Sequence, residues 1–213
     1  MFISRGYLIT LEGIDGCGKS TQVSRLQQFL SWQNIPFVSV REPGGTPAGE
    51  DIRKILLQND YPLSLQCELL LYMTARSELA DQIIIPALLA GKLVICDRYT
   101  DSTLAYQGYG GGADISWIRE LNHKVTRGIS PDLTFLLDLP VSEAFSRRGN
   151  NNDRMEQNDL AYYHRVRDGY LELARMEPHR FIVINASKGI EDQEKLIGGY
   201  VKELTNKRLT KEV

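Results

Sequence analysis

A glycine-rich segment near the start of the chain carries the residue types that bind phosphate groups. It reads Gly13-Ile14-Asp15-Gly16-Cys17-Gly18-Lys19-Ser20 and fits the pattern G-x-x-x-x-G-K-[ST]. An apolar run precedes it and a helical pattern follows, which is the strand–loop–helix setting that this motif requires. Backbone N–H groups of such a loop converge on phosphate oxygens, while the lysine neutralises their charge and the serine hydroxyl ligates Mg²⁺. We therefore expect residues 13–21, ending at Thr21, to bind ATP, with Lys19 catalytic and Ser20 on the metal.

Loops of this kind occur in several classes of protein, and the rest of the sequence narrows the choice. A plain glycine-rich turn with an incidental lysine is one alternative, but the flanking strand and helix patterns argue against it. A GTPase carries an N-K-x-D segment that reads guanine, whereas here Asn206-Lys207 is followed by Arg208-Leu209. No ABC-type signature segment is present, and the chain is short for a motor protein. These observations favour a small-molecule kinase.

A second charged segment follows the apolar run at 93–96. It reads Asp97-Arg98-Tyr99. In a doubly wound sheet, a carboxylate at this end of a strand lies beside the phosphate loop, where it can hold Mg²⁺ or its waters. Arg98 would enter the same crevice, and its planar fork can bind a monophosphate with two hydrogen bonds. The alternative is a charged strand end that faces solvent.

Hydrophobic patterns along the 213 residues predict the elements that position these groups. Short apolar runs predict buried strands at 7–11, 37–40, 93–96, 133–139 and 181–184. Helical patterns lie at 19–32, 49–57, 65–90, 116–126, 141–148, 160–176 and 190–204, and Pro86 is expected to kink the third helix. Strands that alternate with helices predict a parallel sheet covered on both faces. We expect one α/β domain over residues 1–213, a three-layer α/β/α sandwich of the P-loop NTPase class with a five-stranded parallel sheet.

Two segments do not fit as plain connections between these elements. Residues 106–114 contain four glycines, and residues 147–156 contain Arg147, Arg148 and Arg154 around an asparagine tract. Each is either a mobile lid or a surface turn. The arginines favour the second segment as a short lid.

Composition limits the partners and the compartment. Apolar residues make up 42% of the chain, charged residues 24%, and the formal net charge is −2, so there is no electrostatic reason to expect a nucleic-acid surface. No apolar stretch approaches the roughly 20 residues that span a membrane, and no signal-peptide core precedes the first strand. Three unclustered cysteines suit a reducing cytosol. We expect a soluble cytoplasmic protein that binds neither nucleic acid nor membrane, in which Cys17 is either reactive or buried and inert.

Four further segments resemble the thymidylate kinase family, in order and over nearly the whole chain. They are Arg41-Glu42-Pro43-Gly44-Gly45-Thr46, the stretch from Asp97-Arg98-Tyr99 through Ser102-Thr103-Leu104-Ala105-Tyr106-Gln107-Gly108, Pro131-Asp132-Leu133-Thr134, and Asp153-Arg154-Met155-Glu156. The resemblance implies that the chain transfers the γ-phosphoryl group of Mg-ATP to dTMP, giving dTDP and ADP on the route to dTTP for DNA synthesis. It also implies a homodimer. The apolar helix at 65–90 offers a face either to a second copy or to the core of one copy.

The resemblance further assigns nine residues to dTMP binding: Glu42, Arg53, Tyr72, Arg76, Arg98, Ser102, Thr103, Tyr106 and Gln107. The arginines correspond to those around the acceptor phosphate, and Asp15 and Glu42 match acidic positions near the metal and that phosphate. Tyr72 would stack on thymine. Gln107, with Ser102 or Thr103, would hydrogen-bond the base, while Tyr106 would lie under the deoxyribose and disfavour a 2′-hydroxyl. Taken singly, Tyr72 could be a core residue and Arg53 a solvated one.

Some members of the resembled family carry an arginine in the phosphate loop where this chain has Gly16, and others place basic residues in the lid. Gly16 and the three lid arginines resemble the second, bacterial type. Among these arginines Arg148 is favoured to reach the transferring phosphoryl group, and with Lys19, Arg98 and Asp15 it completes the predicted catalytic set, while Ser20 and Asp97 hold Mg²⁺. Two other functions stay open: a P-loop kinase for another deoxynucleotide or a deoxynucleoside, and a non-catalytic module gated by ATP.

Overall fold

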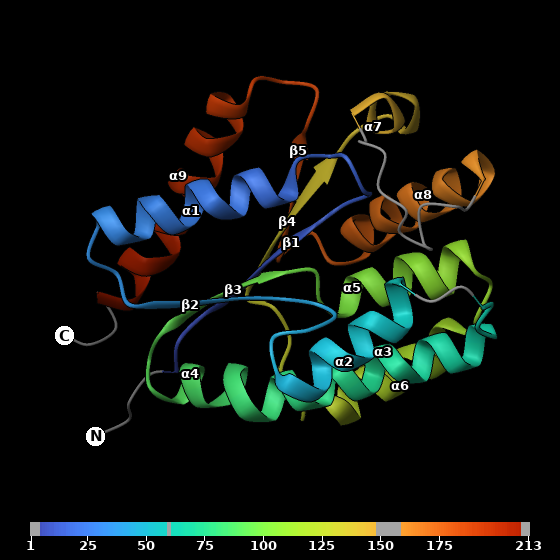
Figure 1. The fold of residues 1–213 in the computed structure, drawn as a ribbon. Helices are drawn as coiled ribbons and strands as arrows, with labels where there is room; N and C mark the ends of the chain where they lie inside the picture. Colours follow the sequence, from blue (N-terminus) through green and yellow to red (C-terminus); the bar gives the residue numbers. More distant parts are fainter. Residues whose placement is uncertain (1–4, 59–60, 148–158, 210–213) are drawn as a thin grey trace.

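The computed structural model describes residues 5–58, 61–147 and 159–209, and its centre is a parallel β-sheet (Figure 1). The five strands are β1 (Leu8–Glu12), β2 (Phe37–Arg41), β3 (Leu93–Asp97), β4 (Leu133–Asp138) and β5 (Phe181–Asn185). Their order across the sheet is β2-β3-β1-β4-β5. Each strand lies within one residue of its predicted bounds, and the predicted five-stranded parallel sheet is confirmed.

The central strand β1 is buried along its whole length. Ile9 pairs with Ile95 of β3 on one side and with Leu133 of β4 on the other. Its neighbour Leu8 belongs to one hydrophobic cluster, with Val94, while Ile9 belongs to the other. Because both faces of the strand are covered, its sequence is a continuous apolar run rather than an alternation.

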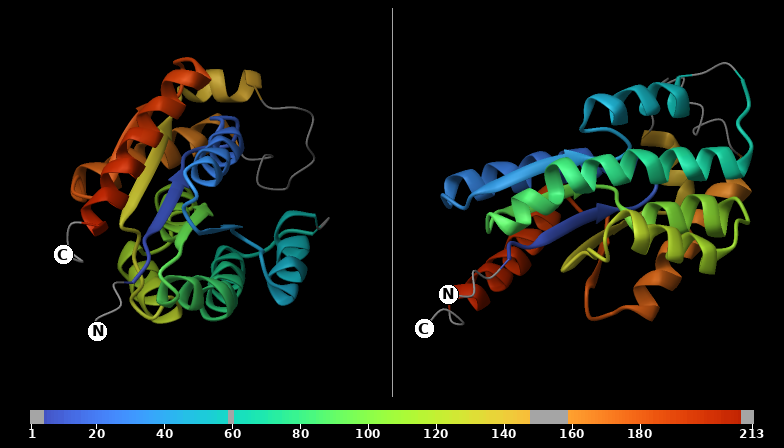
Figure 2. Two further views of the ribbon diagram at one scale, coloured as in Figure 1. Left: turned by 90° about the vertical axis from the view of Figure 1, so that its left-hand side faces the viewer. Right: turned by 90° about the horizontal axis from the view of Figure 1, so that it is seen from below.

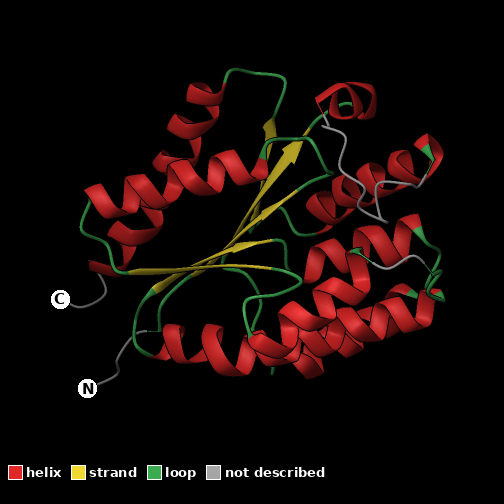
Figure 3. Cartoon of the chain, in the orientation of Figure 1, coloured by secondary structure: helices red, strands yellow, loops and turns green. Residues whose placement is uncertain are grey.

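Helices cover both faces of this sheet and make three layers (Figures 1 and 3). The elements are α1 (Lys19–Trp32), α2 (Pro47–Leu57), α3 (Leu65–Leu79), α4 (Ile85–Leu89), α5 (Thr100–Thr103), α6 (Ile115–Val125), α7 (Val141–Arg147), α8 (Leu160–Met176) and α9 (Ile190–Leu209). Helices α1 and α9 pack on each other over one face, and α3, α4, α6 and α8 lie toward the other (Figure 2). None of the helices in the described ranges has the length and apolarity needed to cross a membrane.

The helix expected at 65–90 is one run with an irregular middle. A π-helical turn, η1 (Ala80–Ile84), separates α3 from α4, and Pro86 stands in the first turn of α4. The N–H group of Ile85 reaches back five residues to the carbonyl of Ala80. Proline lacks an N–H donor and crowds the preceding turn, so the wider turn falls directly before it.

The segment at 106–114 is not a mobile lid or a surface turn, and that expectation was wrong for most of its length. Residues Leu104–Gly110 form a second π-helical turn, η2, in which Tyr106 and Gln107 are buried. Two glycines permit close packing here, since an added Cβ would lie 2.4 Å from Ile115 Cδ1 at Gly108 and 2.7 Å from Val166 Cγ2 at Gly110. The predicted lid at 147–156 lies outside the described residues, except for Arg147.

Candidate active site

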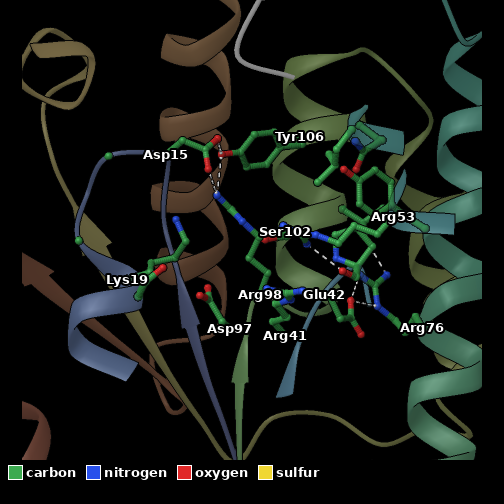
Figure 4. A pocket seen from close by; sticks show the side chains of 18 of the residues that line it. Asp15, Lys19, Arg41, Glu42, Arg53, Arg76, Asp97, Arg98, Ser102 and Tyr106 are labelled. Carbon is green, nitrogen blue, oxygen red and sulfur yellow. Dashed lines mark hydrogen bonds and ion pairs between the residues drawn. The ribbon is translucent and has the colours of Figure 1, made fainter. Parts of the chain in front are cut away.

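A pocket of about 540 Å³ opens at the carboxyl ends of β1, β2 and β3 (Figure 4). This is the end of a parallel sheet at which α/β proteins bind ligands. Most of the predicted site residues line it: Asp15, Gly16, Gly18, Lys19, Ser20, Thr21, Glu42, Arg53, Tyr72, Arg76, Asp97, Arg98, Ser102, Thr103, Tyr106 and Gln107. The same lining includes Arg147, and also Arg41, Pro43 and Leu57, which were not predicted as site residues. The pocket therefore brings the phosphate loop and the acceptor-side residues together.

The phosphate loop joins β1 to α1 and is closely packed from behind. The Lys19 ammonium group donates to the carbonyls of Gly13 and Ile14, at 2.9 and 3.0 Å. Gly16 has φ +83°, and a Cβ there would lie 2.4 Å from the carbonyl oxygen of Ala144 in α7. A side chain, arginine included, therefore does not fit at this position without moving α7. Cys17 is 1% exposed, which favours the inert alternative for its thiol.

Three predicted residues do not line the pocket surface. Gly13, Ile14 and Cys17 lie in the loop behind it, where Ile14 and Cys17 are part of the hydrophobic core. Their predicted contribution is through backbone N–H groups, and it stays a prediction. Arg148 and Arg154 lie outside the described residues.

Arg98 connects the phosphate loop to the acceptor side of the pocket. Its guanidinium donates to the Gly13 carbonyl at 3.0 Å and to Asp15 Oδ1 at 2.5 Å. On the other side it donates to Ser102 Oγ at 3.3 Å and to the Tyr106 hydroxyl at 3.2 Å. Burial opposes the positive charge, but Asp15 and its other neighbours outweigh that effect and hold the pKa of Arg98 well above its usual value.

The backbone of Arg98 is held in the left-handed region, with φ +69°, which is uncommon for a residue other than glycine. Its N–H donates to the carbonyl of Leu11 at 3.1 Å, and its own carbonyl accepts from the Cys96 thiol at 2.9 Å. The next N–H, of Tyr99, donates to Glu12 Oε1 at 2.7 Å. These contacts on both sides of the residue fix the direction in which the side chain enters the pocket.

Glu12 is a buried carboxylate beneath the site that the sequence analysis missed. Oε2 accepts from the hydroxyls of Ser102, at 2.6 Å, and Tyr170, at 3.0 Å. Burial and the charge of Asp101 raise the pKa of Glu12 from 4.5 to about 7, against the opposing effects of Ser102, Arg98 and the Tyr99 N–H group. Glu12 thus ties β1 to the turn after β3. The only signal in the sequence was a charged residue at the end of an apolar strand.

Arg76 is fully committed to protein partners, although it lines the pocket. Nε and Nη2 both donate to Glu42 Oε2, at 2.8 and 2.5 Å, and Nη2 also donates to the Tyr99 carbonyl at 3.1 Å. Nη1 donates to Thr103 Oγ1 at 2.8 Å and to Asn122 Oδ1 at 2.7 Å. A guanidinium has five N–H donors, and these contacts use all of them. The guanidinium is thus held by protein groups, and the expected grip of Arg76 on the acceptor phosphate stays a prediction.

The remaining acceptor-side groups come from α2, α3 and η2. Arg53 donates to the Pro43 carbonyl at 2.8 Å. Tyr106 donates to Asp15 Oδ2 at 2.9 Å, and burial raises its pKa well above the usual value. The Gln107 amide donates to Glu68 Oε1 at 2.8 Å; Glu68 was not predicted as a site residue.

Two oxygen donors in the pocket suit a magnesium ion bound together with phosphate. Asp97 ends β3 and lies beside Lys19 (Figure 4). Ser20 is the second residue of α1 and lines the same pocket. Within the ranges that the structure describes, no three or more acidic, histidine or cysteine side chains are grouped so that they could coordinate a metal ion by themselves. Mg²⁺ is commonly held by one or two protein oxygens that substrate phosphates and waters complete, and Ser20 and Asp97 fit that pattern.

Comparison with known proteins places these features in a family. The chain matches the family model for thymidylate kinase over residues 11–197. It is 48% identical over 185 residues to a thymidylate kinase of Kosmotoga olearia, covering 86% of this chain and 89% of that protein. It is 44% identical over 202 residues to a thymidylate kinase of Symbiobacterium thermophilum, covering 94% of each. The crystal structure of thymidylate kinase from Ehrlichia chaffeensis aligns with a TM-score of 0.72 at 41% identity, over 84% of this chain and 93% of that one.

Proposed function

The chain belongs to the thymidylate kinase family, and from this we propose how its own residues divide the work of the reaction. It transfers the γ-phosphoryl group of ATP to dTMP, giving dTDP and ADP on the route to dTTP. The observation that carries the assignment of roles is that one pocket is lined both by Lys19 and Ser20 and by Arg53 and Arg98. Two anionic phosphates can thus be held face to face.

Phosphoryl transfer needs positioning and charge neutralisation more than covalent help from the protein. We assign the ATP phosphates to the backbone N–H groups of residues 13–21 and to Lys19. Arg98 and Arg53 neutralise the acceptor phosphate, and Asp15 holds Arg98 in place. The nucleophile is already an anionic phosphate oxygen, so no strong general base is required. Contacts that tighten only in the transition state raise kcat, a role that we assign to Arg98, Lys19 and Arg148.

Arg76 and Glu42 receive a different role from the one the sequence suggested. With every donor of Arg76 engaged, we assign it to shaping the acceptor pocket by fixing Glu42 and Thr103. Ser102, Thr103, Tyr72, Tyr106 and Gln107 would then contact the nucleoside part of dTMP, each from the pocket wall.

Mg²⁺ fits the donor set of Ser20 and Asp97, and bound there it would supply neutralisation of charge on the β- and γ-phosphates. Lys19 lines the same pocket as these two donors and lies beside Asp97 (Figure 4), so the chain's own part is to orient the ATP phosphates around the ion.

Four further expectations are carried forward as proposals. They are a single domain over residues 1–213 with a lid near 147–156, a homodimer, a cytoplasmic location and the absence of nucleic-acid or membrane partners. The dimer is supported by α3, which exposes Leu70 by 48% of its surface although the helix also packs against α2 and α6.

The assignment is tested by ADP release from Mg-ATP with a panel of acceptors: dTMP, dUMP, dCMP, dGMP, thymidine and no acceptor. We expect dTMP to be phosphorylated with the highest kcat/KM. Preference for another monophosphate or for a nucleoside would support a related P-loop kinase. Tight ATP binding without turnover on any acceptor would support a non-catalytic module and end the kinase assignment.

A further inference from the structure

Gln107, which lines the pocket, forms a buried pair with Glu68 of α3. Gln107 is 2% exposed and Glu68 is 6% exposed, and Gln107 Nε2 donates to Glu68 Oε1 at 2.8 Å. Glu68 stands on α3, one turn before the pocket-lining Tyr72, and so shares a face of the helix with it.

The donor–acceptor chemistry of this pair is one-directional. An ionised carboxylate can only accept hydrogen bonds, whereas a carboxamide carries both an NH₂ donor and a carbonyl acceptor. Glu68 therefore selects the amide orientation of Gln107 in which nitrogen faces α3. The carbonyl oxygen, Oε1, then lies on the opposite side of the planar amide from Glu68.

Burial leaves the amide orientation as the main freedom of the Gln107 side chain, and backbone hydrogen bonds hold the turn that carries it. Its carbonyl accepts from the Ala113 N–H group at 3.0 Å, and the neighbouring Tyr106 carbonyl accepts from the Tyr162 hydroxyl at 3.1 Å. Both contacts tie the π-helical turn to the surrounding structure. The orientation that the amide takes is thus set by its carboxylate partner rather than by movement of the turn.

We propose that Glu68 is a positioning residue that sets base selectivity by holding Gln107 with its acceptor oxygen available to the base. The proposal rests on the proposed function, in which Gln107 contacts the base. A keto pyrimidine such as thymine offers a ring N–H that can donate to Gln107 Oε1. Cytosine has an unprotonated ring nitrogen at the same position, so this nitrogen and Oε1 would both be acceptors and could not form a hydrogen bond. A site built around such a hydrogen bond rejects an analogue that cannot form it by a factor on the order of 10⁴.

The first test is Glu68→Gln, assayed as the ratio of kcat/KM for dTMP to kcat/KM for dCMP. A glutamine at position 68 can donate or accept, so Gln107 is no longer held in one orientation. We expect the ratio to fall by about 5-fold to 150-fold, the range that one mismatched buried polar group costs, with KM for ATP unchanged. Glu120→Gln, on the surface of α6 where Glu120 pairs with Lys124, is the control for the same substitution and should leave the ratio unaltered.

The decisive variant is the exchange Glu68→Gln together with Gln107→Glu. The amide placed at position 68 would donate to one oxygen of the carboxylate placed at position 107. The other carboxylate oxygen would accept from the ring N–H. The hydrogen bond between the two positions then runs in the reverse direction, while position 107 still presents an acceptor to the base. We expect the double variant to recover the dTMP preference relative to Glu68→Gln. A purely structural role for Glu68 would instead lower kcat/KM for both nucleotides alike, with no recovery.

An unchanged ratio in Glu68→Gln, or a double variant no more selective than the single one, would overturn the proposal. Should Glu68→Gln fail to fold, the test is the ratio of kcat/KM for dTMP to kcat/KM for dCMP in the double variant. The proposal requires the double variant to prefer dTMP, and a double variant without that preference would overturn it. A wild-type chain inactive on dTMP would refute the proposed function instead, and the two failures are therefore distinguishable.

Discussion

Replacement of Glu12 by glutamine should change how the stability of the chain depends on pH. The carboxylate is 0% exposed, and glutamine has nearly the same shape. Its carbonyl oxygen can accept from the Tyr99 N–H group, while its NH₂ group donates to the hydroxyl oxygens of Ser102 and Tyr170. We therefore expect Glu12→Gln to fold, which makes it a clean removal of one titrating group.

The sign and size of the effect follow from the pKa of Glu12, which burial raises from 4.5 to about 7. Between these values the folded chain holds a proton that the unfolded chain has released, so the contribution of Glu12 to the free energy of unfolding falls as pH rises through this window. It is fully present below about pH 4.5 and levels off above about pH 7. At about 1.4 kcal/mol per pH unit, the whole interval corresponds to roughly 3 kcal/mol, of which roughly 2–3 kcal/mol should be lost between pH 5 and pH 8.

Urea unfolding of wild type and Glu12→Gln at pH 5, 6, 7 and 8, at constant ionic strength, measures this difference. Subtracting the variant's free energy of unfolding from that of the wild type cancels the other titrating groups, and the difference should decline with rising pH. A difference that stays flat, or that grows with pH, would show that Glu12 is ionised throughout and that its three donors outweigh its burial.

Three further substitutions test the assigned roles. Lys19→Ala should lower kcat/KM by the equivalent of about 3 kcal/mol, as expected for loss of a preorganised charge; turnover near the wild-type rate would contradict its role. Arg76→Met should lower the free energy of unfolding by about 3–5 kcal/mol, because Glu42 is left as an unpaired buried charge, and urea unfolding should show part of that loss restored by adding Glu42→Gln. Arg148→Ala should lower kcat more than it raises the KM for dTMP, and an unchanged kcat in steady-state assays would transfer the role to Arg147 or Arg154.

The strands and the phosphate loop were predictable because their signals are local. A short apolar run predicts a buried strand without information from the rest of the chain. The G-x-x-x-x-G-K-[ST] pattern likewise predicts a strand before it and a helix after it. The placement of Asp97 and Arg98 followed from the rule that parallel strands end at one edge of the sheet. The position of these two residues could be predicted from the order of strands and helices alone, which the alternating hydrophobic pattern indicated.

The features that sequence reasoning missed depend on contacts between distant parts of the chain. Glu12 meets Ser102 across 90 residues, and Glu68 meets Gln107 across 39, and nothing near either carboxylate indicates its partner. The segment at 106–114 was misread because clustered glycines usually indicate a flexible turn. Here a glycine is required at position 110 because Val166 and Tyr162 of α8 lie against it and leave no room for a Cβ. Only the packed structure shows this reason.

The Arg98 guanidinium has its hydrogen bonds on both sides of the crevice, with Gly13 and Asp15 on one side and Ser102 and Tyr106 on the other. A movement of either wall therefore changes the hydrogen bonds that Arg98 makes to the opposite wall. To the extent that each nucleotide moves Arg98, the binding of one must change the affinity for the other by the same factor. Changing the acceptor specificity of the chain is then not a matter of substituting residues in one wall alone. Variants selected for a different monophosphate should also need compensating changes where the donor nucleotide binds.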